Sequence, residues 1–226
     1  MTARALSALV VLAMQGAPLQ RITRDQLCVT NGEITTTPNG RMAINTPSAR
    51  AVVQMPTASD VAEIRFTYLG PSEGSKPLAS GEMRRQVGLK LKALNQCNLL
   101  YVMWHIEPDT KVAVSIKRNP GQSTHEQCDA HGYTTIRPRV STTLPRVLPG
   151  ESRTLRAVPT GDDLTVTADT KIVWEGSIGN GLANIDGPVG LRTDNARFEF
   201  DYAVMPTARG STTRCESSGG QDAGAD

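Results

Sequence analysis

The chain has 226 residues, with 24 basic and 22 acidic side chains and a formal net charge of +2. At roughly 150 residues per domain, this length corresponds to one large domain or two small ones. The near-balance of charge excludes the basic excess with which duplex-DNA-binding proteins neutralise phosphates, so we expect no nucleic-acid partner. Apolar residues are dispersed outside the N-terminus, so we also expect no integral membrane span.

Residues 1–17 have the pattern of a secretory signal peptide. Arg4 precedes an apolar run at 5–14, and small residues follow it up to Ala17. The run is too short to span a bilayer and has the length of a signal-peptide apolar region. We therefore expect a secreted or extracytoplasmic protein. The alternative is a buried N-terminal helix, which Pro18 and the polar residues after it disfavour.

The expected elements are β-strands, because apolar and polar residues alternate over short segments bounded by Pro, Gly, Asn or Asp. In chain order the expected strands are Ile34–Ile44, Arg50–Gln54, Val61–Leu69, Gln86–Leu94, Leu99–Ile106, Lys111–Arg118, Thr154–Val158, Leu164–Ala168, Lys171–Glu175, Val189–Arg192 and Arg197–Val204. This pattern predicts an all-β fold, an antiparallel β-sandwich over residues 22–205. Residues 206–226 are poor in large apolar side chains and are expected to be a disordered tail or linker.

Three of these segments are expected to be adjacent antiparallel strands, because the connections between Gln86–Leu94, Leu99–Ile106 and Lys111–Arg118 are short. Their aliphatic residues, Ala93 included, alternate in phase with Trp104, so we place this set in the core. Trp174 is assigned to the core for the same reason. The residues expected on the opposite, solvent-facing side are Gln86, Lys90, Lys92, Tyr101, His105, Ser115 and Lys117.

The four cysteines fit an exported protein. None belongs to a paired CxxC arrangement and the three histidines are scattered, so no zinc site is expected. Cys97 and Cys128 flank the expected hairpin, which predicts a Cys97–Cys128 bond. Cys28 and Cys215 lie near the ends of the expected sandwich and are predicted to form the second bond. Four cysteines allow three pairings, so the sequence leaves the connectivity open.

The segments Thr154–Ala157, Asp163–Gly176 and Gly187–Asp201 resemble the closing half of the concanavalin A-like lectins and glucanases. The resemblance is strongest over residues 154–204 and implies a jelly-roll sandwich. One departure is Thr170, which occupies a turn position where that family usually has glycine. The fold supports lectins, hydrolases, lyases and adhesion modules, so the resemblance implies architecture more than activity.

We expect this architecture to bind carbohydrate without catalysis. The expected outward face is locally basic, and its aromatic and polar groups suit an anionic or polyhydroxylated polysaccharide or cell-surface glycan. The candidate ligand-binding residues are Lys90, Lys92, Tyr101, His105, Ser115 and Lys117. The long loop from Asn119 to Tyr133 is a second candidate site, through His125, His131 or Tyr133.

Two other functions remain open. A jelly-roll polysaccharide lyase would use Tyr101, His105, Gln86 and Arg85 as base, acid and charge-neutralising groups. A retaining glycosidase would need neighbouring carboxylates, for which the sequence offers Glu107 and Asp109 without a third acid. A structural or adhesion module without a small ligand is the remaining alternative.

No organic cofactor is expected. Many jelly rolls of the resembling family hold a structural calcium ion, and oxygen ligands are available near the last strand. The candidate calcium ligands are Asp194, Asn195 and Asp201. The alternative is a polar turn followed by a solvated strand face.

Overall fold

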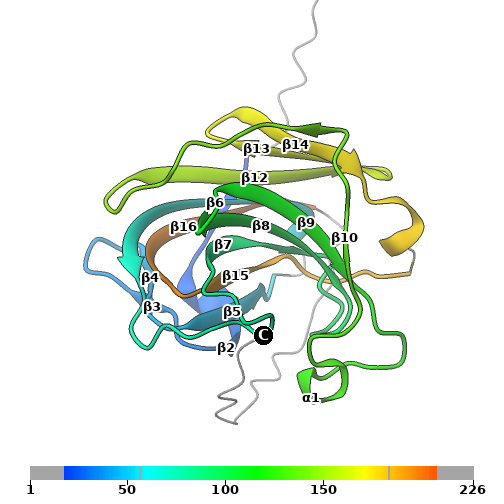
Figure 1. Cartoon of the computed structure of the whole chain (residues 1–226), viewed down its shortest axis with the longest axis horizontal. Helices are drawn as coiled ribbons and strands as arrows, with labels where there is room; N and C mark the ends of the chain where they lie inside the picture. Colours follow the sequence, from blue (N-terminus) through cyan, green and yellow to red (C-terminus); the bar gives the residue numbers. More distant parts are fainter. Residues whose placement is uncertain (1–17, 56–57, 183, 208–226) are drawn as a thin grey trace, which may run out of the picture.

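The computed structural model describes residues 18–55, 58–182 and 184–207, and it contains two antiparallel sheets that pack face to face (Figure 1). This confirms the expected β-sandwich. The predicted signal peptide, most of the predicted tail and Cys215 lie outside the described residues. Within the described chain, no helix is both long enough and apolar enough to cross a membrane.

The first sheet has nine strands among the described residues. In spatial order they are β11 (Val140–Ser141), β14 (Lys171–Ser177), β13 (Asp163–Ala168), β12 (Ser152–Thr160), β6 (Ala58–Pro71), β16 (Ala196–Pro206), β4 (Met42–Ile44) and β3 (Thr35–Thr36), with β1 (Gln20–Ile22) also paired to β16. Because β1 pairs with the last strand, the sandwich starts slightly before residue 22.

The second sheet has seven strands in the part of the chain that is described. Their order is β10 (Tyr133–Thr135), β9 (Lys111–Lys117), β8 (Leu99–Glu107), β7 (Arg85–Leu91), β15 (Gly190–Asp194), β5 (Ser48–Val53) and β2 (Leu27–Asn31). The predicted antiparallel neighbours β7, β8 and β9 are confirmed. Strand β15, distant in sequence, lies between β7 and β5 and joins the two parts of the sheet (Figure 1).

The sequence pattern missed the shortest elements. The expected strand Ile34–Ile44 is split into β3 and β4, because the chain turns at Gly40, whose φ is +78°. Strands β1, β2, β10 and β11 were not expected, since two to five residues carry little periodicity. The short helices η1 (Arg24–Gln26), α1 (His125–Cys128) and η2 (Gly179–Leu182) lie in connections.

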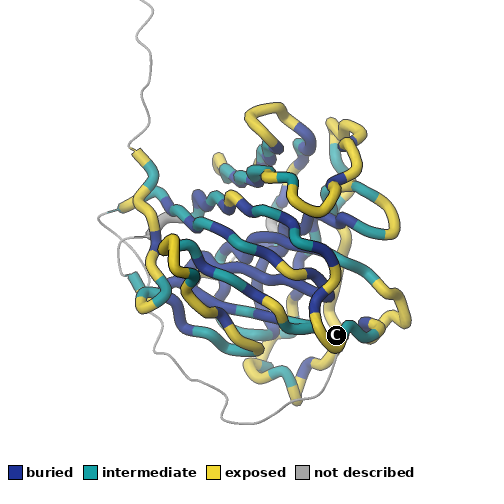
Figure 2. The backbone as a smooth tube through the Cα atoms, turned by 90° about the vertical axis from the view of Figure 1, so that its left-hand side faces the viewer, coloured by how far each residue is buried: buried dark blue, intermediate teal, exposed yellow. Residues whose placement is uncertain are grey.

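The core lies between the sheets and is built by alternation on their inner faces. Phe66 of β6 meets Trp104 of β8 edge-on, with ring centroids 5.6 Å apart, and also meets Phe198 of β16 at 5.5 Å. Trp104 and Trp174 are fully buried, which confirms that both belong to the core. Figure 2 shows the buried segments running through the centre of the strands and the exposed ones in the connections.

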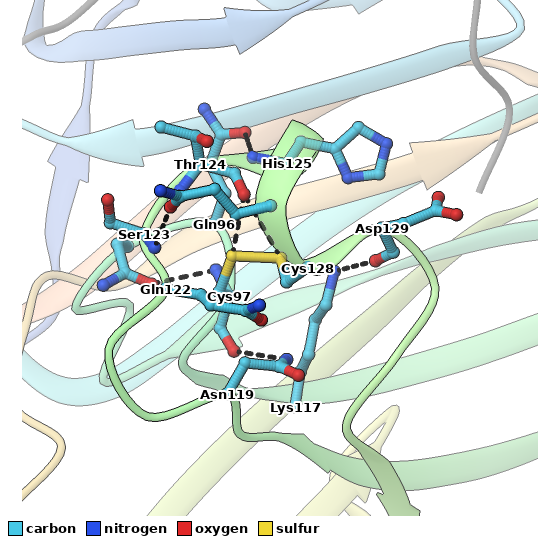
Figure 3. The surroundings of a disulfide bond; sticks show 12 residues. Gln96, Cys97, Lys117, Asn119, Gln122, Ser123, Thr124, His125, Cys128 and Asp129 are labelled. Carbon is cyan, nitrogen blue, oxygen red and sulfur yellow. Dashed lines mark hydrogen bonds between the residues drawn. A yellow bond between two sulfur atoms is a disulfide. The ribbon is translucent and has the colours of Figure 1, made fainter.

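The Cys97–Cys128 bond is present and joins the start of β8 to the end of α1 (Figure 3). Its two ends are 31 residues apart in sequence and both cysteines are buried. The bond therefore holds the 119–133 loop against the edge of the seven-stranded sheet. Cys28 is also disulfide-bonded, while its predicted partner Cys215 lies outside the described residues.

The hairpin between β13 and β14 turns through two residues, Asp169 and Thr170. Both have positive φ, +48° and +73°. Two-residue hairpin loops of this kind require a left-handed conformation at both positions, which costs a residue with a Cβ atom about 1–2 kcal/mol. The departure of Thr170 from the family pattern therefore leaves the turn intact but strained.

We predict that Thr170→Gly stabilises the protein by about 1 kcal/mol, because glycine adopts positive φ without steric cost. Urea unfolding followed by fluorescence measures the change. Thr165→Gly is the matched control in the interior of β13 and should be destabilising. Equal effects of the two substitutions would show that the turn carries no strain.

Candidate ligand-binding face

The outward side of the seven-stranded sheet carries a cluster of polar and aromatic side chains, which we call the polar face. The strand registers align Gly190, Lys90, Tyr101 and Ser115 across β15, β7, β8 and β9. The members of the polar face are Arg50, Gln86, Lys90, Tyr101, His105, Ser115, Lys117, Tyr133, Arg192 and Asp194.

The expectation that this side is solvated is wrong. Lys90 is 3% exposed and Lys117 1%, and Gln86, Tyr101 and His105 are also buried. The physical reason is that the long side chains lie on one another: Arg192 lies over the ring of Tyr101, and the exposed ring of Tyr133 lies against the buried Lys117. The polar face is therefore an ordered layer in which charged groups are largely withdrawn from water.

Lys92, predicted to join this face, does not. It adopts a left-handed conformation with φ of +49°, and its ammonium lies 2.8 Å from Asp60 of β6 in the other sheet. The same break in alternation reverses Ala93, which was expected in the main core and instead packs with Tyr101 and Met103 on the outward side. A single positive φ angle thus ends the regular strand at Leu91.

A buried ion pair lies at the centre of the polar face. Nε of Arg192 is 2.8 Å from Oδ2 of Asp194, and the two side chains are 7% and 1% exposed. Gln86 donates to the same carboxylate at 2.6 Å, and the Ser48 hydroxyl lies 3.4 Å from it. Burial opposes ionisation of Asp194, but its cationic and hydrogen-bonding neighbours outweigh burial and lower its pKa.

Two tyrosines form an aromatic wall beside this pair. The rings of Tyr101 and Tyr133 are stacked with centroids 6.0 Å apart. Arg192 lies over Tyr101 at 5.2 Å and places its guanidinium 3.4 Å from the Tyr133 hydroxyl. On β7, between Arg192 of β15 and Met103 of β8, the residue in register is Gly88, which has no side chain. Cation–π contact and stacking therefore order the wall from both sides.

The disulfide-bonded loop leads to Tyr133, and Figure 3 shows its contacts with Lys117 and with the chain around Cys97. Lys117 donates from Nζ to the carbonyl of Asp129 at 2.6 Å, and Asn119 donates to the carbonyls of Cys97 and His131. The chain then enters β10 at Tyr133. Of the three loop residues expected near a site, Tyr133 joins the polar face while remaining exposed; His131 is exposed and His125 is partly buried.

Positive charge dominates the polar face. Arg50, Lys90, Lys117 and Arg192 contribute four basic groups, against the one carboxylate of Asp194 among its members. Burial, followed by the charges of Arg50, Arg192 and Lys117, lowers the pKa of Lys90 to about 7. Such a surface favours an anion that can replace lost solvation.

Of the groups considered for lyase chemistry, Gln86, Tyr101 and His105 share the polar face, whereas Arg85 does not. Burial and nearby cations lower the pKa of His105 to about 3, so it is neutral at physiological pH and a weak base. Arg85 forms an ion pair with Glu107 at the end of β7, where its partner strand shifts register. It therefore lies apart from Tyr101 and His105.

Of the two carboxylates considered for glycosidase chemistry, Glu107 is held by structural contacts. Glu107 pairs with Arg85 and accepts a hydrogen bond from the Tyr68 hydroxyl at 3.2 Å. Asp109 lies in the turn after Pro108, outside β8. Within the described residues this pair thus has the character of a hairpin turn and a structural ion pair.

The three candidate calcium ligands do not converge. Asp194 belongs to the polar face, while Asp201 lies on the outward side of β16 and pairs with Arg21 and Arg41. The Asn195 side chain bonds to the backbone of Lys76. Among the described residues, no group of three or more His, Cys, Asp or Glu side chains could hold a metal ion.

Sequence reasoning did not identify Arg50 and Arg192 as site residues. Leu191 faces the core, so alternation within β15 alone would have turned Arg192 outward. What the alternation could not supply is the position of β15 beside β7, because the two strands are about a hundred residues apart. The sequence therefore indicated that Arg192 points outward, but it did not indicate which residues lie beside Arg192.

We predict that Arg192→Met destabilises the protein by about 3–5 kcal/mol, because it leaves Asp194 buried without its counter-charge. The double variant Arg192→Met/Asp194→Asn should recover part of this loss in urea unfolding. Arg139→Met, which removes an exposed pair with Asp163, should change stability little. A double variant as unstable as the sum of its single variants would contradict a coupled pair.

We predict a histidine-dependent loss of stability in acid. The pKa of His105 is lowered in the folded state, so the unfolded chain takes up a proton first, and stability falls as pH decreases from about 6.5 towards 3. The slope approaches about 1.4 kcal/mol per pH unit. Denaturant unfolding between about pH 6.5 and 4.5 should show a shallower slope for His105→Gln and an unchanged one for His131→Gln. A slope unaffected by His105→Gln would contradict this assignment.

The comparisons with known proteins identify the fold. No protein-family model matches the sequence, and no curated protein matches it. The carbohydrate-binding module CBM66 from Bacillus subtilis superposes with a TM-score of 0.54 at 14% identity, covering 82% of this chain and 96% of that one. The transglycosylase Crh5 gives a TM-score of 0.49 at 13% identity and covers 83% of this chain and 81% of its own. The alginate lyase AlyC3 gives a TM-score of 0.45 at 12% identity and covers 72% of each chain. This chain is therefore similar in architecture to jelly-roll sandwiches of the CBM66 type.

Proposed function

We propose that the protein is a secreted carbohydrate-binding module whose polar face binds an anionic or polyhydroxylated glycan. The observation that carries this proposal is the grouping of Arg50, Lys90, Lys117 and Arg192 around the stacked tyrosines, with Asp194 as the one carboxylate among the polar-face residues. Basic groups attract carboxylate or sulfate substituents, and tyrosine offers both a ring and a hydroxyl to a sugar.

Binding accounts for this arrangement better than catalysis does. A lyase needs a general base whose pKa lies near the working pH, whereas the pKa of His105 is about 3. The ion pair and the cation–π contacts hold the face in one arrangement before a ligand arrives. Preorganised groups bind with a smaller loss of conformational entropy, which is the property that a binding module requires.

The disulfide supports an extracytoplasmic location. Disulfides persist mainly in oxidising compartments, and the buried Cys97–Cys128 bond fixes the loop that carries Tyr133. CBM66 binds carbohydrate by its description and has the same architecture, which agrees with the proposal while leaving the ligand of this chain to experiment.

We predict that the protein binds oligogalacturonate or alginate more tightly than neutral oligosaccharides, with an affinity that falls as salt increases. Arg50→Met should weaken uronate binding about tenfold, since a charge-assisted contact contributes about 1.5–3 kcal/mol. Calorimetric titration at low and moderate salt measures both effects. Arg156→Met is the matched control, because Arg156 pairs with Glu63 on the opposite sheet.

The alternatives give different results. Retention of no polysaccharide on a glycan array would favour a structural or adhesion module. Growth of ultraviolet absorbance on a uronate polymer would indicate lyase activity. Equal loss of affinity in Arg50→Met and Arg156→Met would place the binding site away from the polar face.

A further inference from the structure

Lys90 occupies an unusual position in the polar face. It stands in the middle of β7, between Gly190 of β15 and Tyr101 of β8, and is 3% exposed. Among the described residues, it makes no hydrogen bond and no ion pair. A poorly hydrated ammonium group without an acceptor is disfavoured, so the charged form of this amine is stabilised when it gains a counter-charge.

The groups around Lys90 cannot supply that counter-charge. Its charged neighbours on β5, β15 and β9 are Arg50, Arg192 and Lys117, which repel an ammonium group. The one carboxylate of the face, on Asp194, already binds Arg192 and accepts from Gln86. The polar face therefore offers Lys90 no anion of its own, and a counter-charge has to come from a ligand.

We propose that Lys90 is the contact for a carboxylate of the ligand, a uronic acid unit, and that it takes up one proton when the ligand binds. This proposal rests on the proposed glycan-binding function and adds that the affinity for the glycan depends on pH. The ligand carboxylate, the neutral Lys90 amine and one proton from solvent combine into an ammonium–carboxylate ion pair. No covalent bond forms or breaks.

The proposal fixes the direction of the pH dependence. With a pKa of about 7, the Lys90 amine is already protonated in mild acid, so affinity is highest there. Above about pH 7 each bound carboxylate must bring a proton, and affinity falls by up to about tenfold per pH unit. A uronic acid stays ionised throughout this range, so its own titration does not contribute.

The other groups facing Lys90 come from every strand packed against β7. Those that remain in one state near neutral pH are Asp194, whose pKa is lowered, Arg192, whose pKa is raised, and His105, whose pKa is about 3. Arg50 is a guanidinium and stays charged. The remaining titratable groups of the face are Tyr101, Lys117 and Tyr133. The variant Lys90→Met tests whether the pH dependence of binding belongs to Lys90 rather than to one of them.

The experiment is calorimetric titration of a galacturonate oligomer between about pH 6 and 8.5, in buffers of low and high ionisation enthalpy. The wild type should lose about tenfold in affinity between pH 7 and 8.5 and show proton uptake as a buffer-dependent heat. Lys90→Met should bind weakly with no pH dependence over this range. Lys92→Met is the matched control and should keep the wild-type slope, since Lys92 pairs with Asp60 away from the polar face.

A second measurement needs no ligand. The folded pKa of Lys90 is below that of the unfolded chain, so the unfolded state binds more protons between about pH 7 and 10, and stability should rise with pH in this window. Lys90→Met should abolish this rise while remaining folded, because it removes a buried amine and keeps the aliphatic stem.

Two outcomes would overturn the proposal: a pH slope that survives in Lys90→Met, or uronate binding with equal affinity at all these pH values. The last result would leave glycan binding intact and remove only proton uptake. If no uronate binds at any pH, the proposed function itself fails.

Discussion

The buried ion pair between Arg192 and Asp194 is the interaction on which the polar face depends. Both residues come from β15, the strand that joins the two parts of the seven-stranded sheet. The carboxylate fixes the guanidinium, and the guanidinium in turn rests on Tyr101 and approaches Tyr133. Without the carboxylate, the four basic groups of the polar face would have no negative charge among its members to offset their repulsion, so Asp194 stabilises a largely positive surface.

Much of the fold was predictable from residue alternation. In β6, Ile64 and Phe66 are buried in the core while Arg65 between them is exposed, and β12, β13 and β16 show the same period of two. Long strands repeat this signal several times, so their existence and facing follow from sequence. Short strands do not repeat the alternation. Lys92 interrupts it by adopting a positive φ angle, and since Lys92 is not a glycine the sequence does not indicate this change.

The candidate site was predictable only in part, for a related physical reason. Lys90, Tyr101 and His105 lie on consecutive strands, so local periodicity placed them on one face. Their burial depends on Arg192 and Tyr133, which reach them from strands distant in sequence or from a disulfide-bonded loop. Long-range contacts of this kind leave no local pattern, and the depressed basicity of Lys90 follows from them rather than from its own segment.

Gly88 has a consequence for how this surface can change during evolution. A Cβ atom at this position would lie 2.5 Å from the Met103 sulfur and 2.9 Å from the Met103 Cα, and closer still to the carbonyl oxygen of Val102. Even alanine would therefore push β7 away from β8, the strand that carries Tyr101 and His105. New ligand specificities can arise by exchanging the charged side chains around Gly88, but position 88 itself has no room for a side chain.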